Sequence, residues 1–134
     1  MLDPHAALIY TMVIVSAADA EVPEAELQLI GDIIGHLPVF RGFDRKALPR
    51  VLNGCTQALA RANGLEATLD EVSAALPPKL HETAYAIACD LIASDGEASQ
   101  EEIGLLNLIR ERLAIDRLIA FAIERGARAR FQRL

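Results

Sequence analysis

The stretch AADAEVPEAE at residues 17–26 returns in altered form as ASDGEASQEE at residues 93–102. Each copy follows a run of apolar residues and precedes a segment whose apolar residues recur at helical spacing. Shifting residues 9–37 by 76 positions aligns them with residues 85–113 and leaves seven identical positions, of which three are acidic. This internal repeat predicts two related halves, each made of a buried helix, an acidic turn and an amphipathic helix.

Helical spacing continues through the rest of the chain, and no segment shows the alternation typical of a half-buried strand. We expect helices over residues 4–18, 23–37, 44–62, 65–76, 79–94, 99–113 and from 116 toward the C-terminal arginines. Gly64 is expected to end the third helix as a C-terminal glycine. The sequence thus predicts an all-α fold, a compact bundle of about seven helices that forms a single domain over residues 1–134.

Three of these helices are predicted to bury one apolar stripe each. The expected core residues are Leu27, Ile30, Ile33 or Ile34 and Leu37 in the second helix, Ile103, Leu106, Ile109 and Leu113 in the sixth, and Leu118 or Ile119, Ala122 and Ile123 in the seventh. The first and fifth helices are almost uncharged, which is typical of helices buried on several sides.

The composition limits the class of protein. A chain of 134 residues that is 52% hydrophobic can enclose a core without disulfides, and Cys55 and Cys89 lie among apolar residues as reduced core cysteines. The net charge of -6 argues against nucleic acid as a partner. The first apolar run has no preceding basic residue and is too short to span a bilayer. We therefore expect a cytoplasmic protein without direct membrane insertion.

The acidic turns share the pattern D-x-E-x-x-x-x-E, which can direct three carboxylates toward one point. Carboxylate oxygens are the ligands that calcium and magnesium prefer. The candidate metal ligands are Asp19, Glu21 and Glu26 in the first copy and Asp95, Glu97 and Glu102 in the second, with Asp90 on the preceding helix. The positions that an EF-hand reserves for Gly and Glu carry Gln100 and Leu106, so the turn is not of that type.

A second interpretation assigns these acids to helix capping. Ser99 and Glu102 match a capping box, and acidic residues favour the first turn of any helix. Asp90 interrupts an apolar helix, so it needs a partner. A bound cation, a C-terminal arginine or a turn amide would each serve.

The residues also resemble the tellurite-resistance TerB family over essentially the whole chain. The resemblance rests on VSAADAEVPEAE with LQLIGDIIGHL, and on CDLIASDGEASQEE with IGLLNLIRERLAID. It implies a bundle of about seven helices and acidic A-D-G-E turns that have been proposed to bind divalent metal. Asp95, Gly96, Glu97 and Glu102 match the second turn, whereas Ala20 replaces the glycine in the first turn.

No nucleophile with a base, phosphate-cradling glycine loop or dinucleotide fingerprint occurs, so we expect no enzymatic activity and no catalytic residues. The leading hypothesis is a non-enzymatic cytoplasmic stress-response module, of the tellurite-resistance kind that the resemblance implies, whose acidic turns bind a divalent cation or present charge to a protein partner. The alternative is a protein–protein interaction or scaffold domain without a metal site. Both hypotheses predict a protein partner. A second copy of the chain is one such partner, and its binding would form a homodimer.

Overall fold

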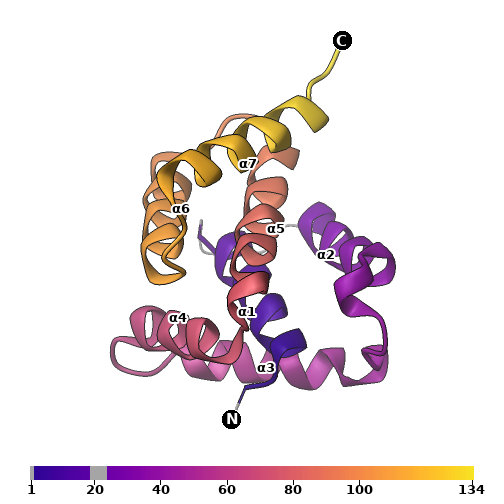
Figure 1. Ribbon diagram of the computed structural model, residues 1–134. Coiled ribbons are helices and arrows are strands. Elements are labelled where there is room, and N and C mark those ends of the chain that lie inside the picture. Colours follow the sequence, from indigo (N-terminus) through magenta and orange to yellow (C-terminus); the bar gives the residue numbers. More distant parts are fainter. Residues whose placement is uncertain (1, 19–23) are drawn as a thin grey trace.

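The computed structural model describes residues 2–18 and 24–134. Within these residues the chain forms seven α-helices and no strand, so the predicted all-α bundle is confirmed (Figure 1). The helices are α1 (Pro4–Ser16), α2 (Glu24–His36), α3 (Leu48–Leu59), α4 (Gly64–Ala75), α5 (His81–Ser94), α6 (Gln100–Arg112) and α7 (Arg117–Arg130). Short 3-10 helices precede α3 and α5 and follow α2, namely η2 (Arg45–Ala47), η3 (Pro78–Leu80) and η1 (Pro38–Phe40).

Helices α1 and α5 form the centre of the bundle (Figure 1). α1 packs against α3, α4 and α5, while α5 also packs against α6 and α7. An apolar helix can be covered on several sides, and Leu8, Ile9 and Met12 of α1 have no exposed surface. The prediction that the two nearly uncharged segments are buried helices is confirmed.

Helices α2 and α6 have matching boundaries. α2 runs from residue 24 to 36 and α6 from 100 to 112, so both ends are separated by the 76 positions of the sequence alignment. The two helices lie on either side of the central pair in the view of Figure 1. Each follows one of the acidic turns, and the third residue of each helix is a glutamate, Glu26 in α2 and Glu102 in α6.

The expectation that Gly64 ends the third helix is wrong. α3 ends at Leu59, the left-handed residue is Asn63 with φ 53°, and Gly64 begins α4. A Cβ atom on Gly64 would lie 2.3 Å from the carbonyl oxygen of Leu59. Gly64 is therefore needed for the close approach of two backbones and not for helix termination.

The predicted apolar stripes are only partly buried. Ile30, Ile34, Ile109 and Leu113 lie in the core as expected, but Leu27, Leu37, Ile103, Leu118 and Ile119 are exposed by 37% or more of their surface. In α7 the buried residues are Ala120 and Ala127, and of the predicted residues Ile123 is partly buried against the core, so the predicted face was rotated from the observed one but shares Ile123 with it. α7 packs mainly on α5 and lies at the edge of the bundle, where one neighbour cannot cover a broad apolar stripe.

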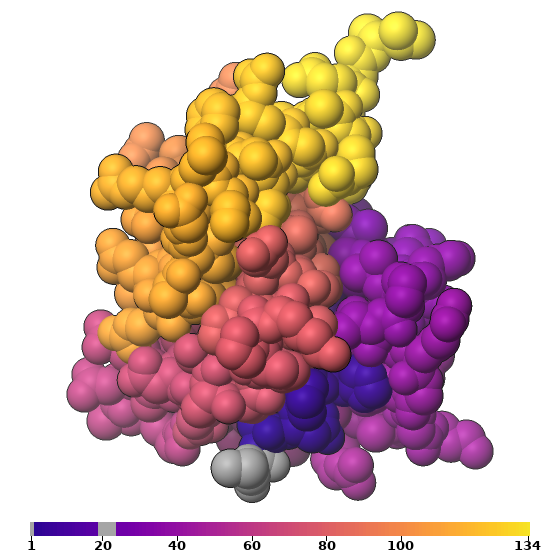
Figure 2. Space-filling view, in the orientation of Figure 1, coloured from indigo at the N-terminus to yellow at the C-terminus, as the bar shows by residue number. Residues whose placement is uncertain are grey.

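The segment after α7 projects from the body of the molecule (Figure 2). Among the described residues, no helix has the length and apolar character needed to cross a membrane.

Candidate metal site between the two acidic turns

Three carboxylates from distant parts of the chain meet at one point. One ligand oxygen each from Glu26, Asp95 and Glu102 can be chosen so that all three lie within 4.8 Å of one another. Glu26 and Glu102 are buried, with 4% and 5% of their surface exposed, whereas Asp95 is exposed. Glu26 and Glu102 occupy the same position in the sequence alignment, and each lies in the first turn of its helix. The site therefore lies where the starts of α2 and α6 approach each other. We call these three residues the acidic cluster.

Local structure explains the position of Glu102. Ser99 is the N-cap of α6, and its hydroxyl accepts a hydrogen bond from the backbone N–H of Glu102 at 3.1 Å. The Glu102 carboxylate accepts one from the backbone N–H of Ser99 at 2.9 Å, which completes the predicted capping box. This pair fixes the carboxylate at the start of α6.

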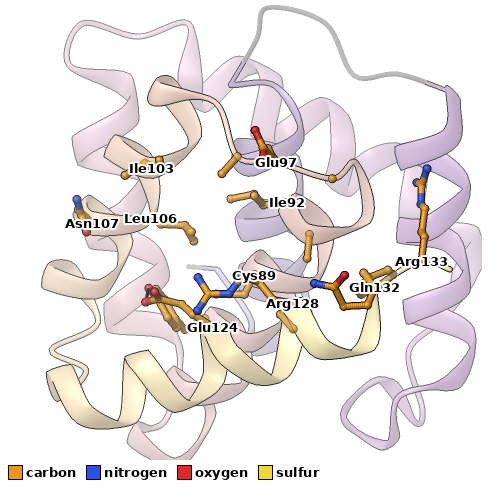
Figure 3. Close-up of a pocket in the computed structure, with 16 residues that line it drawn as sticks. Cys89, Ile92, Glu97, Ile103, Leu106, Asn107, Glu124, Arg128, Gln132 and Arg133 are labelled. Carbon is orange, nitrogen blue, oxygen red and sulfur yellow. Dashed lines mark hydrogen bonds between the residues drawn. The ribbon is translucent and has the colours of Figure 1, made fainter.

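The turn before α6 separates Asp95 from Glu97. Asp95 ends α5, and Gly96 follows with φ +103°, a left-handed conformation that favours glycine. After this reversal Glu97 lies outside the acidic cluster and lines a cavity between α5, α6 and α7 (Figure 3). The two acids of one turn thus belong to different sites.

Asp90 lies outside the acidic cluster as well. Its carboxylate accepts a hydrogen bond from the guanidinium of Arg130 on α7, and the two side chains form an ion pair. The partner of Asp90 is therefore a C-terminal arginine, one of the three alternatives that its apolar surroundings suggested. Asp19 and Glu21, the other candidate ligands, fall outside the described residues.

The chemistry of the acidic cluster suits a hard divalent cation. Carboxylate oxygens at short mutual distance are the donors that Ca²⁺ and Mg²⁺ select. An ionised carboxylate has about four lone-pair sites, so Glu102 can accept the Ser99 hydrogen bond and still bind a cation. The exposed Asp95 leaves one side of the cluster in contact with water, which can complete the coordination shell of either ion.

The ring nitrogens of the three histidines contact backbone carbonyl oxygens. His81 directs its Nδ1 at the carbonyl oxygen of Leu113 at 3.0 Å and its Nε2 at that of Leu76 at 3.1 Å, so it joins the ends of α4 and α6. His5 contacts the carbonyl oxygen of Val39, and His36 contacts that of Asp32. Among the described residues, none of the three belongs to a group that could hold a metal ion.

Sequence reasoning missed the cavity of about 880 Å³ between α5, α6 and α7 (Figure 3). Cys89 and Tyr85 line it, and the Tyr85 hydroxyl donates a 2.7 Å hydrogen bond to the carboxylate of Glu124. Burial raises the pKa of the Cys89 thiol to about 12, so the thiol is protonated near neutral pH and is a poor nucleophile. Burial and the Glu124 hydrogen bond also raise the pKa of Tyr85. Ile103 was predicted to lie in the core, but it is exposed and lines this cavity.

Comparison with known proteins identifies the family of the chain. A family model described as "Tellurite resistance protein TerB" matches residues 5–121, a range that includes both acidic turns and extends into α7. No curated protein and no solved structure gives a significant match. Because the family match covers most of the chain, the resemblance found in the sequence is confirmed, and this protein belongs to the TerB family of tellurite-resistance proteins.

Proposed function

We propose that this protein is a non-enzymatic module of the cytoplasmic stress response that binds a divalent cation between its two acidic turns. The observation that carries the proposal is the convergence of Glu26, Asp95 and Glu102, which come from segments 76 positions apart in the chain. Capping explains why Glu102 lies at the start of α6, but it does not require Glu26 of α2 to lie beside it.

The energetic argument concerns the two buried members. Two ionised carboxylates within 4.8 Å of each other repel. A divalent cation bound between them attracts both and outweighs this repulsion. Calcium or magnesium fits the oxygen donors, whereas zinc usually selects sites with His or Cys ligands.

Calorimetric titration tests the cation site. The wild type is titrated with Ca²⁺, Mg²⁺, Mn²⁺ and Zn²⁺, and Asp95→Asn is compared with Glu97→Gln. These two acids flank Gly96 in the same exposed turn, but only Asp95 belongs to the acidic cluster. Saturable binding of Ca²⁺ or Mg²⁺ that Asp95→Asn weakens and Glu97→Gln preserves supports the site. Absence of binding up to millimolar cation rules it out.

A second candidate function is favoured by the outer surface of α7. Leu118, Ile119 and Phe121 are exposed by 76%, 40% and 57%, and Arg117 and Arg125 lie within a turn of them. A cluster of large apolar side chains with arginine at its edge is typical of protein interfaces. Under this alternative α7 binds a protein partner, and a second copy of the chain is the simplest one.

Sedimentation equilibrium tests the homodimer. The wild type is expected to show a mass that rises with concentration toward twice 14.5 kDa, and the double variant Leu118→Gln with Phe121→Gln is expected to stay monomeric. Asp95→Asn is the control and should sediment like the wild type. A wild type that stays monomeric at millimolar concentration contradicts self-association through α7.

A further inference from the structure

The cavity between α5, α6 and α7 is separate from the acidic cluster and has its own chemistry (Figure 3). α5 forms its floor with Cys89 and Ile92, α6 forms one wall with Ile103 and Leu106, and α7 forms the other. Its volume of about 880 Å³ lies within the range of roughly 300–1,000 Å³ that is usual for sites that bind small molecules.

The apolar lining is incompletely covered by the protein itself. Ile103 exposes 43% of its surface although it lies with Leu106 in the lining of this cavity. Covering such side chains with an apolar group is favourable because it removes their surface from water. The lining therefore fits a ligand with an apolar body.

Several polar groups of the cavity lie on α7 and on the segment that follows it. In Figure 3, Arg128 of α7 and Gln132, which follows the end of α7, extend over the cavity, while Arg133 points away from it. Arg128 forms no ion pair or hydrogen bond with any residue that the structure describes. A guanidinium group with free donors is suited to a carboxylate or phosphate.

The acidic residues of the lining do not occupy the guanidinium of Arg128. Glu124 accepts the hydrogen bond of Tyr85, and it also lines a second, shallower cavity together with Arg110 and Arg117. Glu97 lies on the turn at the other side of the cavity (Figure 3). Arg128 thus offers a ligand a guanidinium that forms no ion pair with either acidic residue of the lining.

We propose that this cavity binds an amphipathic organic anion, with its acidic head on Arg128 and Gln132 and its apolar chain on Ile92, Ile103 and Leu106. The ligand is a free monomeric amphiphile with one carboxylate or phosphate, and the proposal does not depend on a cation in the acidic cluster.

Titration of the ¹⁵N-labelled protein with decanoate, followed by amide chemical shifts, tests this site. We expect saturable shifts in α5, α6 and the second half of α7. Arg128→Gln should weaken the affinity about tenfold, as for the loss of one charge-assisted hydrogen bond. Arg125→Gln, which removes an exposed arginine of the same helix outside the cavity, should change the affinity less than about twofold.

A second pair of variants tests the apolar wall. Ile103→Gln should weaken decanoate binding about tenfold, because it replaces an apolar side chain that the ligand would cover. Ile119→Gln is the matched control, since Ile119 has nearly the same exposure, 40% against 43%, and lies outside the cavity. All four variants alter exposed side chains, and their amide spectra report directly whether they fold.

Three results would overturn the proposal. The first is the absence of saturable shifts with decanoate. The second is equal affinity for decyltrimethylammonium, which has the same chain and the opposite charge. The third is binding to vesicles of phosphatidylcholine with phosphatidylglycerol but not to monomeric decanoate, which would assign the surface to a membrane.

Discussion

Replacing Glu102 by Gln should stabilise this protein in the absence of a divalent cation and should lose that advantage in its presence. Glu102 is buried, and its carboxylate lies within 4.8 Å of those of Glu26 and Asp95. The substitution keeps the shape of the side chain and an oxygen that can accept the Ser99 N–H, because capping boxes use Gln as well as Glu. The change therefore removes charge and preserves the helix cap.

The expected magnitude follows from the separation of the charges. Two unit charges at 4.8 Å repel by about 3.5 kcal/mol at an effective dielectric constant of about 20, and by less where water reaches one of them. In EDTA we expect Glu102→Gln to raise the free energy of unfolding by about 2 kcal/mol, or roughly 7 °C in Tm for a chain of this size.

A bound cation removes the advantage of the variant. A ligand at one hundred times its Kd stabilises the native state by about 2.7 kcal/mol. Wild type should gain this amount in saturating Ca²⁺ or Mg²⁺, whereas Glu102→Gln should gain less than about 0.5 kcal/mol because one of its three ligands is neutral. With cation the wild type should therefore be as stable as the variant or more so.

Thermal and urea unfolding followed by circular dichroism measure both conditions. Glu97→Gln is the control, since it removes one exposed charge from the same turn and should shift both curves by less than about 0.5 kcal/mol. A Glu102→Gln variant that is less stable than wild type in EDTA, together with a wild type that does not respond to either cation, would refute the electrostatic reasoning and leave only the helix cap.

The remaining predictions concern the core and the ion pair. Gly64→Ala should destabilise the protein by more than about 2 kcal/mol in urea unfolding, because its Cβ would overlap a carbonyl oxygen, whereas Gly104→Ala, with open space around it in α6, should stabilise by about 0.5–1 kcal/mol. Asp90→Asn should cost less than about 1 kcal/mol, as for a partly exposed ion pair, and should leave calorimetric cation affinity unchanged; a loss of cation affinity would return Asp90 to the metal site. Cys55 and Cys89 should resist iodoacetamide at pH 8 in the native protein and react in urea, because burial raises both pKa values to about 12. The unfolded thiols have the ordinary pKa of 9.0 and therefore release protons at a pH at which the native thiols keep them. The contribution of the two thiols to the free energy of unfolding is thus complete below pH 9 and falls as the pH rises toward 12. Rapid alkylation of the native protein would contradict their burial.

Much of the fold could be predicted because its signals are local. Asp3, Ser99 and Asp116 cap the helices that follow them, and the side chain of each accepts a hydrogen bond from a backbone N–H two or three positions on. Proline lies in the first turn of α1 and α3, where its missing N–H has no cost. Such signals act over a few residues, so the sequence contains them completely.

Predictions about which face of a helix is buried were less successful. The stripe of α6 includes Ile103, yet the neighbouring α7 diverges and leaves the cavity at that point. In α7 the smaller Ala120 and Ala127 face α5, and the larger Leu118 and Phe121 face outward. Hydrophobicity alone favours the larger residues for the core, but close approach of two helices favours the smaller ones.

The amino-acid sequence by itself determined that two acidic turns precede two equivalent helices, because the repeat, the caps and the apolar spacing are all written along the chain. Only the tertiary structure decided which acids meet. Glu26 and Glu102 converge because α2 and α6 both start beside the central pair of helices, whereas Asp90 joins an arginine 40 positions away and Glu97 turns toward a separate cavity. Contacts between distant segments depend on how whole helices pack, and helix packing is a property of the assembled core.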